Sequence, residues 1–318
     1  MISRRVLVTG ATGFVGEALV LRLLLDGLFV PVAAVRGQTR LLGLCPVVTF
    51  ELAKAGALPS LSDIEVVVHT AARVHVMTET MSDALSEFRR INVEGTVRLA
   101  RKAAESGVRR FVFISSIKVN GEETLVGRPF RADDVPAPVD PYGISKKEAE
   151  DALRVIGRET GMEIVIIRPP LVYGPGVKAN FSRMMGVLTK RLPLPLGTIA
   201  NRRSLVGINN LVDLIVVCLD HAAAKNETFL VSDDKDFSTS ELLRCLRREL
   251  GGRAILLPFP GGLLKSALRL VGCGAVVQRL CGSLQVDIVK TREILQWRPP
   301  YSSEVELKRT AIDYLEAH

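Results

Sequence analysis

A tyrosine and a lysine one helical turn apart are the residues whose types and spacing most directly suggest chemistry. Tyr142 and Lys146 stand four positions apart, so on a helix their side chains would share a face. A nearby ammonium stabilises phenolate and would lower the phenol pKa from about 10. Such a tyrosine can exchange a proton with a carbonyl or alcohol oxygen while hydride moves at the attached carbon. Upstream, an apolar run starting at Phe111 ends in the hydroxyls of Ser115 and Ser116, which could hydrogen-bond the same oxygen.

Three glycines near the start of the chain indicate a phosphate-binding turn. Gly10, Gly13 and Gly16 follow the apolar run Val6–Thr9 and precede a helical pattern. The first glycine permits a tight turn, the second a close approach of backbone to pyrophosphate, and the third close packing of the helix on the strand. The free amides of the helix N-terminus would then face the phosphates. This arrangement predicts dinucleotide binding.

The second strand pattern ends in a basic residue where NAD-binding proteins carry an acidic one. An acidic side chain about twenty residues past the glycine turn holds the ribose hydroxyls of NAD, whereas arginine suits a 2′-phosphate. Here Arg36 occupies that place. We therefore expect NADP(H) as the cofactor, with NAD(H) as the alternative.

Alternating strand and helix patterns place these motifs in an α/β fold. Continuous apolar runs are typical of parallel strands covered on both faces. Strands are predicted at Val6–Thr9, Val30–Val35, Val47–Phe50, Val66–Thr70, Phe111–Ser115, Glu163–Arg168 and Thr228–Val231, and helices at Val15–Asp26, Ser82–Ser106, Lys146–Glu159, Ser238–Leu250 and Ser302–Glu316. The pattern predicts a Rossmann-type doubly wound parallel sheet with a smaller C-terminal substrate lobe. We expect residues 1–168 to bind the dinucleotide, with 205–231 returning to that domain, and residues 169–204 and 232–318 to form the lobe.

Several short motifs together resemble the extended short-chain dehydrogenases/reductases, specifically the NAD-dependent epimerase/dehydratase family of nucleotide-sugar enzymes. The resemblance spans nearly the whole chain. It rests on Thr9–Gly16, His69–Ala72, Asn92–Thr96, Ser115-Ser116, Tyr142–Lys146, Arg168–Gly176 and Leu295-Gln296-Trp297-Arg298-Pro299, where Gln296 replaces the family's glycine.

The resemblance implies roles for individual residues. Ser116, Tyr142 and Lys146 would form the catalytic triad. The expected cofactor contacts are Gly10, Thr12, Gly13, Phe14, Val15, Gly16, Arg36, Ala71, Ala72, Arg73, Asn92, Ser115, Lys146, Pro169 and Val172. Asn180 and Arg203 match positions that contact the nucleotide diphosphate, and Arg279 is a weaker candidate. His75 and Lys118 either contact substrate or have ordinary structural roles. The family often dimerises through helices beside the site, so a homodimer is possible.

The residues after Ser116 restrict the type of reaction that we expect. Dehydratases of the family use Thr-Asp-Glu here, whereas this chain has Ile117 and Lys118, so we do not expect dehydration. The block Ser115–Glu122 resembles a subgroup acting on UDP-2-acetamido sugars of bacterial surface polysaccharides such as O-antigen. Because Arg36 favours NADP, we expect reduction of the C4 ketone of a UDP-4-keto-6-deoxy-2-acetamido sugar. The alternative is a UDP-sugar 4-epimerase with tightly bound NAD, and a third possibility is a non-catalytic dinucleotide-binding sensor.

Composition restricts the partners. The 318 residues carry a formal net charge of +8, with basic residues throughout and only 5% aromatic residues, which does not favour nucleic-acid binding. We expect a UDP-sugar partner instead. No apolar run reaches the roughly 20 residues of a membrane span. The start of the chain lacks a signal-peptide pattern, the five cysteines include no Cys-x-x-Cys pair, and the four histidines lack metal-ligand spacing. We therefore expect a cytoplasmic protein without a metal.

Overall fold

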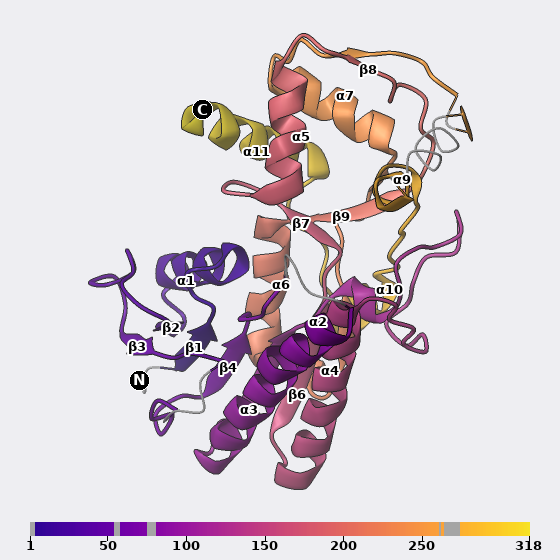
Figure 1. Ribbon diagram of the computed structural model, residues 1–318. Coiled ribbons are helices and arrows are strands. Elements are labelled where there is room, and N and C mark those ends of the chain that lie inside the picture. Colours follow the sequence, from indigo (N-terminus) through magenta and orange to yellow (C-terminus); the bar gives the residue numbers. More distant parts are fainter. Residues whose placement is uncertain (1–3, 54–57, 75–80, 261, 264–273) are drawn as a thin grey trace.

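Seven apolar segments pair as one parallel sheet in the computed structural model, which describes residues 4–53, 58–74, 81–260, 262–263 and 274–318 (Figure 1). The strand order is β10-β6-β5-β4-β1-β2-β3. The strands are β1 (Arg5–Thr9), β2 (Val30–Val35), β3 (Val47–Thr49), β4 (Val66–His69), β5 (Arg110–Ile114), β6 (Glu163–Arg168) and β10 (Thr228–Leu230). Each begins and ends within one residue of its prediction, because a continuous apolar run is a strong signal for a strand buried on both faces.

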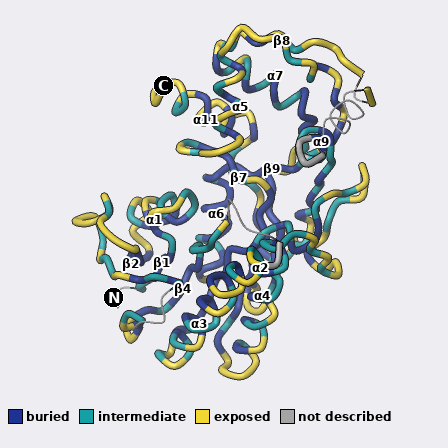
Figure 2. Tube along the Cα trace, viewed as in Figure 1, coloured by how far each residue is buried: buried dark blue, intermediate teal, exposed yellow. Residues whose placement is uncertain are grey.

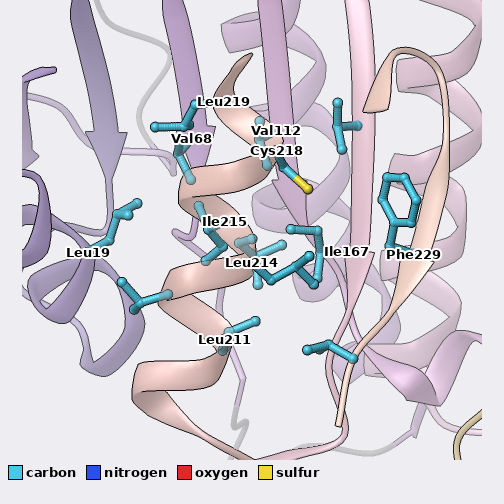
Figure 3. Packing of buried hydrophobic residues seen from close by; sticks show 14 of the residues in the cluster. Leu19, Val68, Val112, Ile167, Leu211, Leu214, Ile215, Cys218, Leu219 and Phe229 are labelled. Atoms are coloured by element: carbon cyan, nitrogen blue, oxygen red, sulfur yellow. The ribbon is translucent and has the colours of Figure 1, made fainter. Parts of the chain in front are cut away.

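Helices cover both faces of this sheet. On one face α1 (Phe14–Asp26) and α6 (Ile208–Asp220) pack against Val6, Val68 and Val112. On the other, α3 (Gly95–Glu105) and α4 (Pro141–Thr160) pack against the intervening strand residues, such as Val67. Figure 3 shows the α6 side chains, Leu214 among them, directed at the strands. The sequence therefore folds as the predicted doubly wound α/β sheet.

Two predicted helices differ from the structure near the site. The segment predicted as one helix over residues 82–106 is α2 (Met81–Phe88), a π-helical turn (Arg89–Glu94) and α3. Single π turns inside helices occur often at functional sites, and this one carries Asn92. Helix α4 starts at Pro141, five residues before its predicted start, so Tyr142 and Lys146 both lie in its first two turns.

The remaining elements include two small sheets that share a separate apolar core, whereas α10 (Val289–Leu295) packs through Leu295 on the core of the main sheet. Strand order is β11-β9-β7 in one sheet and β12-β8 in the other. Tyr173, Phe181, Met185, Leu246 and Leu307 belong to the shared core. The elements are β7 (Leu171–Tyr173), α5 (Ala179–Thr189), β8 (Pro193–Leu194), β9 (Arg203–Gly207), β11 (Asp236–Phe237), α7 (Thr239–Glu249), β12 (Ile255–Leu256), α9 (Gly274–Cys281), α10 (Val289–Leu295) and α11 (Ser303–Ala317).

A buried polar network joins this part to the helices of the main sheet. The Tyr173 hydroxyl on β7 donates to Asp233 Oδ2 at 2.6 Å, and Asn210 Nδ2 on α6 donates to Asp233 Oδ1 at 2.7 Å. Because each of these side chains is buried, losing one partner would leave the others unsatisfied. Figure 2 shows the trace buried through this junction and exposed along β8. Within the described ranges, no helix is both long enough and apolar enough to cross a bilayer.

We expect Leu214→Ala to destabilise the protein strongly. Leu214 is 0% exposed between α6 and the sheet, so its truncation leaves a cavity and should cost about 2–5 kcal/mol of unfolding free energy. Urea unfolding measures this change. Leu25→Ala on α1 is the control, because Leu25 is 85% exposed and its truncation should change stability by at most about 0.5 kcal/mol. Equal losses in both variants would contradict this packing.

Candidate active site

The glycine turn between β1 and α1 leaves no room for larger residues. Gly10 has a φ of +68°, and Gly13 is the N-cap of α1 with its amide donating to the Gly10 carbonyl at 2.8 Å. A Cβ at Gly16 would lie 2.2 Å from that same carbonyl oxygen. Side chains at these positions would push the strand and helix apart. The turn thus keeps the N-terminal amides of α1 open at the carboxyl end of β1.

A pocket of about 800 Å³ lies at the carboxyl ends of β1 and β4. Here the strand order reverses, because β2 and β3 continue to one side of β1 while β4 lies on the other. Dinucleotides bind at this point in doubly wound sheets. The residues that line it include the predicted Gly10, Thr12, Gly13, Phe14, Val15, Gly16, Arg36, Ala71, Ala72 and Arg73. The sequence analysis missed Phe50 and Glu51, which follow β3 at the same edge, and Arg90.

Arg36 is exposed at the rim of this pocket, directly after β2. No hydrogen bond or ion pair joins its guanidinium to the part of the chain that the structure describes. Nearby Arg40, in contrast, binds Glu17. Arg36 is therefore a cation at the pocket edge with its donors available to an anion.

His69 and Asn92 are buried next to residues that line the pocket, Thr70 and Ile91. The His69 ring bridges Thr9 Oγ1 at 2.7 Å and Thr96 Oγ1 at 3.0 Å, and its burial lowers its pKa to about 3, so the ring is neutral. Asn92 accepts from the Arg73 amide at 2.8 Å and donates to Ser145 Oγ at 3.1 Å. The amide of Asn92 thereby ties the loop after β4 to α4.

Lys146 on α4 is buried against β5. It is 1% exposed, and its Nζ donates to the Ile114 carbonyl at 2.8 Å. The Nζ lies 4.3 Å from the Phe113 ring centre and 5.9 Å from that of Tyr142. Burial lowers the pKa of Lys146 to about 7, although the Glu150 charge acts in the opposite direction. The predicted proximity of lysine and tyrosine is present.

The expected lowering of the Tyr142 pKa is not present in this structure. Burial raises the pKa of the phenol, and the carboxylate of Asp140 raises it further. The spacing argument considered only Lys146, whose ammonium is held at a backbone carbonyl of β5. It missed Asp140, which lies two residues before the tyrosine and caps α4.

The two predicted serines have different surroundings. Ser116 is half-buried, and its Oγ accepts from the Lys118 amide at 3.3 Å. Ser115 is instead buried, and its Oγ donates to Glu150 at 2.6 Å. The same carboxylate binds Arg168 through two hydrogen bonds of 2.9 and 2.6 Å. The Ser115 hydroxyl thus supports the structure beneath the site, where the sequence placed a cofactor contact.

The remaining predicted contacts are more scattered. Pro169 is buried and accepts from the Ile117 amide at 3.0 Å, and Val172 is half-buried on β7. Asn180 is exposed in the first turn of α5. Arg203 is half-buried on β9, donates to the Gly282 carbonyl at 3.1 Å and has a pKa lowered by burial. His75 and the side chain of Arg279 lie outside the described residues.

Lys118 binds the Asp140 carboxylate, so its ammonium is already engaged in an ion pair. Nothing in the described part of the chain groups three or more histidine, cysteine or acidic residues as a metal site would.

Together, the sheet, the glycine turn, the half-buried Tyr142 and the buried Lys146 define a dinucleotide-binding α/β protein of the short-chain dehydrogenase/reductase type. Residues 6–232 match the NAD dependent epimerase/dehydratase family. The chain belongs to this family of nucleotide-sugar enzymes.

Three relatives show how far the likeness extends. A UDP-glucose 4-epimerase of Vibrio cholerae is 48% identical over 99% of this chain and 97% of its own length. Among solved structures, a UDP-glucuronic acid 4-epimerase of Bacillus cereus with NAD has a TM-score of 0.79 at 22% identity, covering 99% of both chains. A UDP-glucose 4-epimerase of Thermotoga maritima with UDP-glucose has a TM-score of 0.76 at 21% identity, covering 98% of this chain and 99% of that one. The two structures share the fold of this protein.

We expect Gly16→Ala to weaken dinucleotide binding more than tenfold. The added methyl would meet the Gly10 carbonyl at 2.2 Å and displace the turn that exposes the helix amides. Titration of the apoprotein with NADH, followed by nicotinamide fluorescence, measures the affinity. Gly37→Ala is the control, because a Cβ at Gly37 meets nothing within 4 Å. Unchanged binding in Gly16→Ala would contradict the role of the turn.

Proposed function

We propose that this protein is a UDP-sugar 4-epimerase that retains its nicotinamide dinucleotide through the reaction. The observation that carries the proposal is the 48% identity, over 99% of this chain, to a protein named UDP-glucose 4-epimerase. From the sequence alone, 4-keto reduction was the first expectation and epimerisation the alternative. The comparisons support epimerisation better. The Vibrio cholerae relative is named a UDP-glucose 4-epimerase, and the match covers 97% of its length.

The site has the groups that the proposed chemistry requires. The pocket at β1 and β4 fits a dinucleotide, since glycines at 10 and 16 keep its walls close and the α1 amides open. A nicotinamide dinucleotide bound there would supply reversible hydride transfer at C4 of the sugar. Tyr142 would accept the proton of the C4 hydroxyl and give it back, with Ser116 hydrogen-bonded to the same oxygen. Lys146 would hold positive charge beside the phenol and bind the nicotinamide ribose.

The remaining site assignments belong to the same proposal. Residues 1–168 with 205–231 would bind the dinucleotide, and 169–204 with 232–318 would bind the sugar nucleotide. Arg203, which is half-buried on β9, would face the diphosphate. Asn180 would contact the same diphosphate. Because Ile117 and Lys118 replace the acidic pair that eliminates water, the proposal excludes dehydration.

Reduction of a 4-keto sugar remains the second candidate, and Arg36 is the observation that favours it. A reductase exchanges soluble cofactor at each turnover, and the free guanidinium of Arg36 at the pocket rim suits the 2′-phosphate of NADPH. The family is NAD-dependent by description, so the NADP preference remains a prediction.

We expect the purified protein to interconvert UDP-glucose with UDP-galactose, or UDP-GlcNAc with UDP-GalNAc, without added cofactor. Product separation by ion-pair chromatography measures the conversion. Tyr142→Phe should lower kcat at least 100-fold, because it removes the proton acceptor, and should leave the bound dinucleotide in place. Tyr314→Phe, which lies on α11, is the control. Oxidation of NADPH by a UDP-4-keto-6-deoxy sugar, without interconversion of either pair, would favour the reductase.

Arg36 should set the preference between the two dinucleotides. We expect Arg36→Ala to weaken NADPH binding about 10- to 100-fold, the loss of one charge-assisted contact, and to leave NADH binding unchanged. Calorimetric titration of the apoprotein with each dinucleotide measures both affinities. Arg40→Ala is the control, since Arg40 is already bound to Glu17. Equal NADPH affinity in Arg36→Ala and the unmodified protein would refute this role.

A further inference from the structure

Lys118 connects the two segments that carry the proposed catalytic hydroxyls. Its backbone amide donates to Ser116 Oγ at 3.3 Å, so it helps fix the orientation of that hydroxyl. Its side chain crosses to α4, where Nζ binds the Asp140 carboxylate. Glu122 lies further away, at 3.7 Å from Nζ. Lys118 thus contacts both the segment that carries Ser116 and the helix that carries Tyr142. The spacing of these residues in the sequence does not predict this contact.

Asp140 in turn holds the beginning of α4. Its Oδ1 accepts from the Gly143 amide at 2.6 Å and so caps the helix one turn before Lys146. The turn carrying Lys118 lies directly against this cap, because a Cβ at Gly143 would be 2.8 Å from the Lys118 carbonyl oxygen. The ion pair therefore joins two backbone segments that are already in contact.

The charge of Asp140 acts on Tyr142. Burial raises the pKa of this carboxyl, but hydrogen bonds from Lys118 and Gly143 more than compensate, so the pKa is below its usual value and the group is ionised. A carboxylate two residues before a phenol disfavours phenolate, and it is the second cause, after burial, of the raised Tyr142 pKa. A cation bound to that carboxylate offsets its field.

Among the described residues, the other cations on segments beside α4 have partners of their own. From α2 the phenol meets the uncharged Phe88 ring. Arg73 is bound to Glu87 and Arg89 to Glu148, each as an ion pair. Lys146 on α4 is held at the Ile114 carbonyl. Lys118 is therefore the cation whose partner acts directly on the phenol.

We propose that Lys118 is a positioning residue: through Asp140 it clasps the Ser116 turn to the start of α4 and cancels the carboxylate charge beside Tyr142. From the sequence, Lys118 was either a substrate contact or a residue with an ordinary structural role, and the ion pair gives it a defined positioning role. The proposal rests on the proposed function, since it assigns Tyr142 the proton transfer. The proposal predicts how the pKa of the Tyr142 phenol changes when Lys118, Asp140 or both are replaced.

The first test measures the phenol without any sugar. The protein is labelled with 3-fluorotyrosine and loaded with NAD, and its ¹⁹F spectrum is recorded against pH. The chain has four tyrosines, so loss of one signal in Tyr142→Phe assigns the resonance. We expect Lys118→Met to raise the pKa of this phenol by about 0.5–1 unit, because the Asp140 charge is left unbalanced. Lys118→Arg should keep the unmodified value.

The double variant separates charge balance from substrate contact. Asp140→Asn keeps a helix-capping side chain but removes the charge, so Lys118→Met with Asp140→Asn should restore the pKa. Lys147→Met is the control, because Lys147 forms an exposed ion pair with Asp151 on the same helix and should not shift it. An unshifted phenol in Lys118→Met, or a shift that Asp140→Asn does not reverse, would overturn the proposal.

The second test uses turnover. In Lys118→Met the rising limb of kcat against pH should move to higher pH, lowering kcat about 3- to 10-fold at neutral pH with KM nearly unchanged, and the double variant should recover. A rise in KM that persists in the double variant would instead make Lys118 a substrate contact. If no variant turns over any UDP-sugar but the ¹⁹F pattern holds, the proposed function fails and the clasp stands.

Discussion

Burial of both faces of the parallel sheet is the constraint on which the rest of the structure depends. Strand residues alternate between two cores, one under α1 and α6 and the other under α3 and α4. With the faces covered, polar groups can reach open space only at the strand ends. The glycine turn after β1, the loop after β4 and Ser116 after β5 all emerge at the same edge. The candidate site is thus a consequence of strand direction, and its chemistry depends on which side chains follow each strand.

Below that edge, one buried carboxylate keeps α4 in register with the sheet. Glu150 is 0% exposed and binds Arg168 of β6 and Ser115 at the end of β5. Arg154 also binds Glu150, at 3.1 Å. Removal of the Glu150 carboxylate would leave the buried Arg168 without its ionic partner, which is among the more costly changes a core can undergo. Glu150 follows Lys146 by one helical turn. The contacts that attach α4 to the sheet therefore also fix the position of Lys146 relative to β5. Structural and chemical requirements on α4 are therefore satisfied by one network.

The sequence predicted those features that depend on short, local patterns. Continuous apolar runs located the strands, and the spacing of glycines placed the dinucleotide turn where the structure has it. What escaped prediction depends on partners distant in sequence. The hydrogen bond from the Ser115 hydroxyl to Glu150, 35 residues away, has no local sequence signal, and the expected cofactor contact of Ser115 stays a prediction. The sign of the Tyr142 pKa shift was wrong because burial and Asp140 outweigh a lysine held elsewhere. Asp140 itself had a readable signal, an acidic residue before a proline at a helix start.

The net positive charge is concentrated in two segments of the chain. Residues 164–212 and 250–286 contain eleven lysines and arginines and no aspartate or glutamate, so the net charge of +8 arises from these two segments. They supply most of the part beyond the main sheet, including α5, β9 and α9. At the glycine turn the phosphate-binding groups are neutral backbone amides, which need exact backbone geometry but no side-chain charge. The absence of acidic residues from these segments raises the positive potential there without adding basic residues, and under the proposed function this potential would attract the anionic sugar nucleotide over long distances.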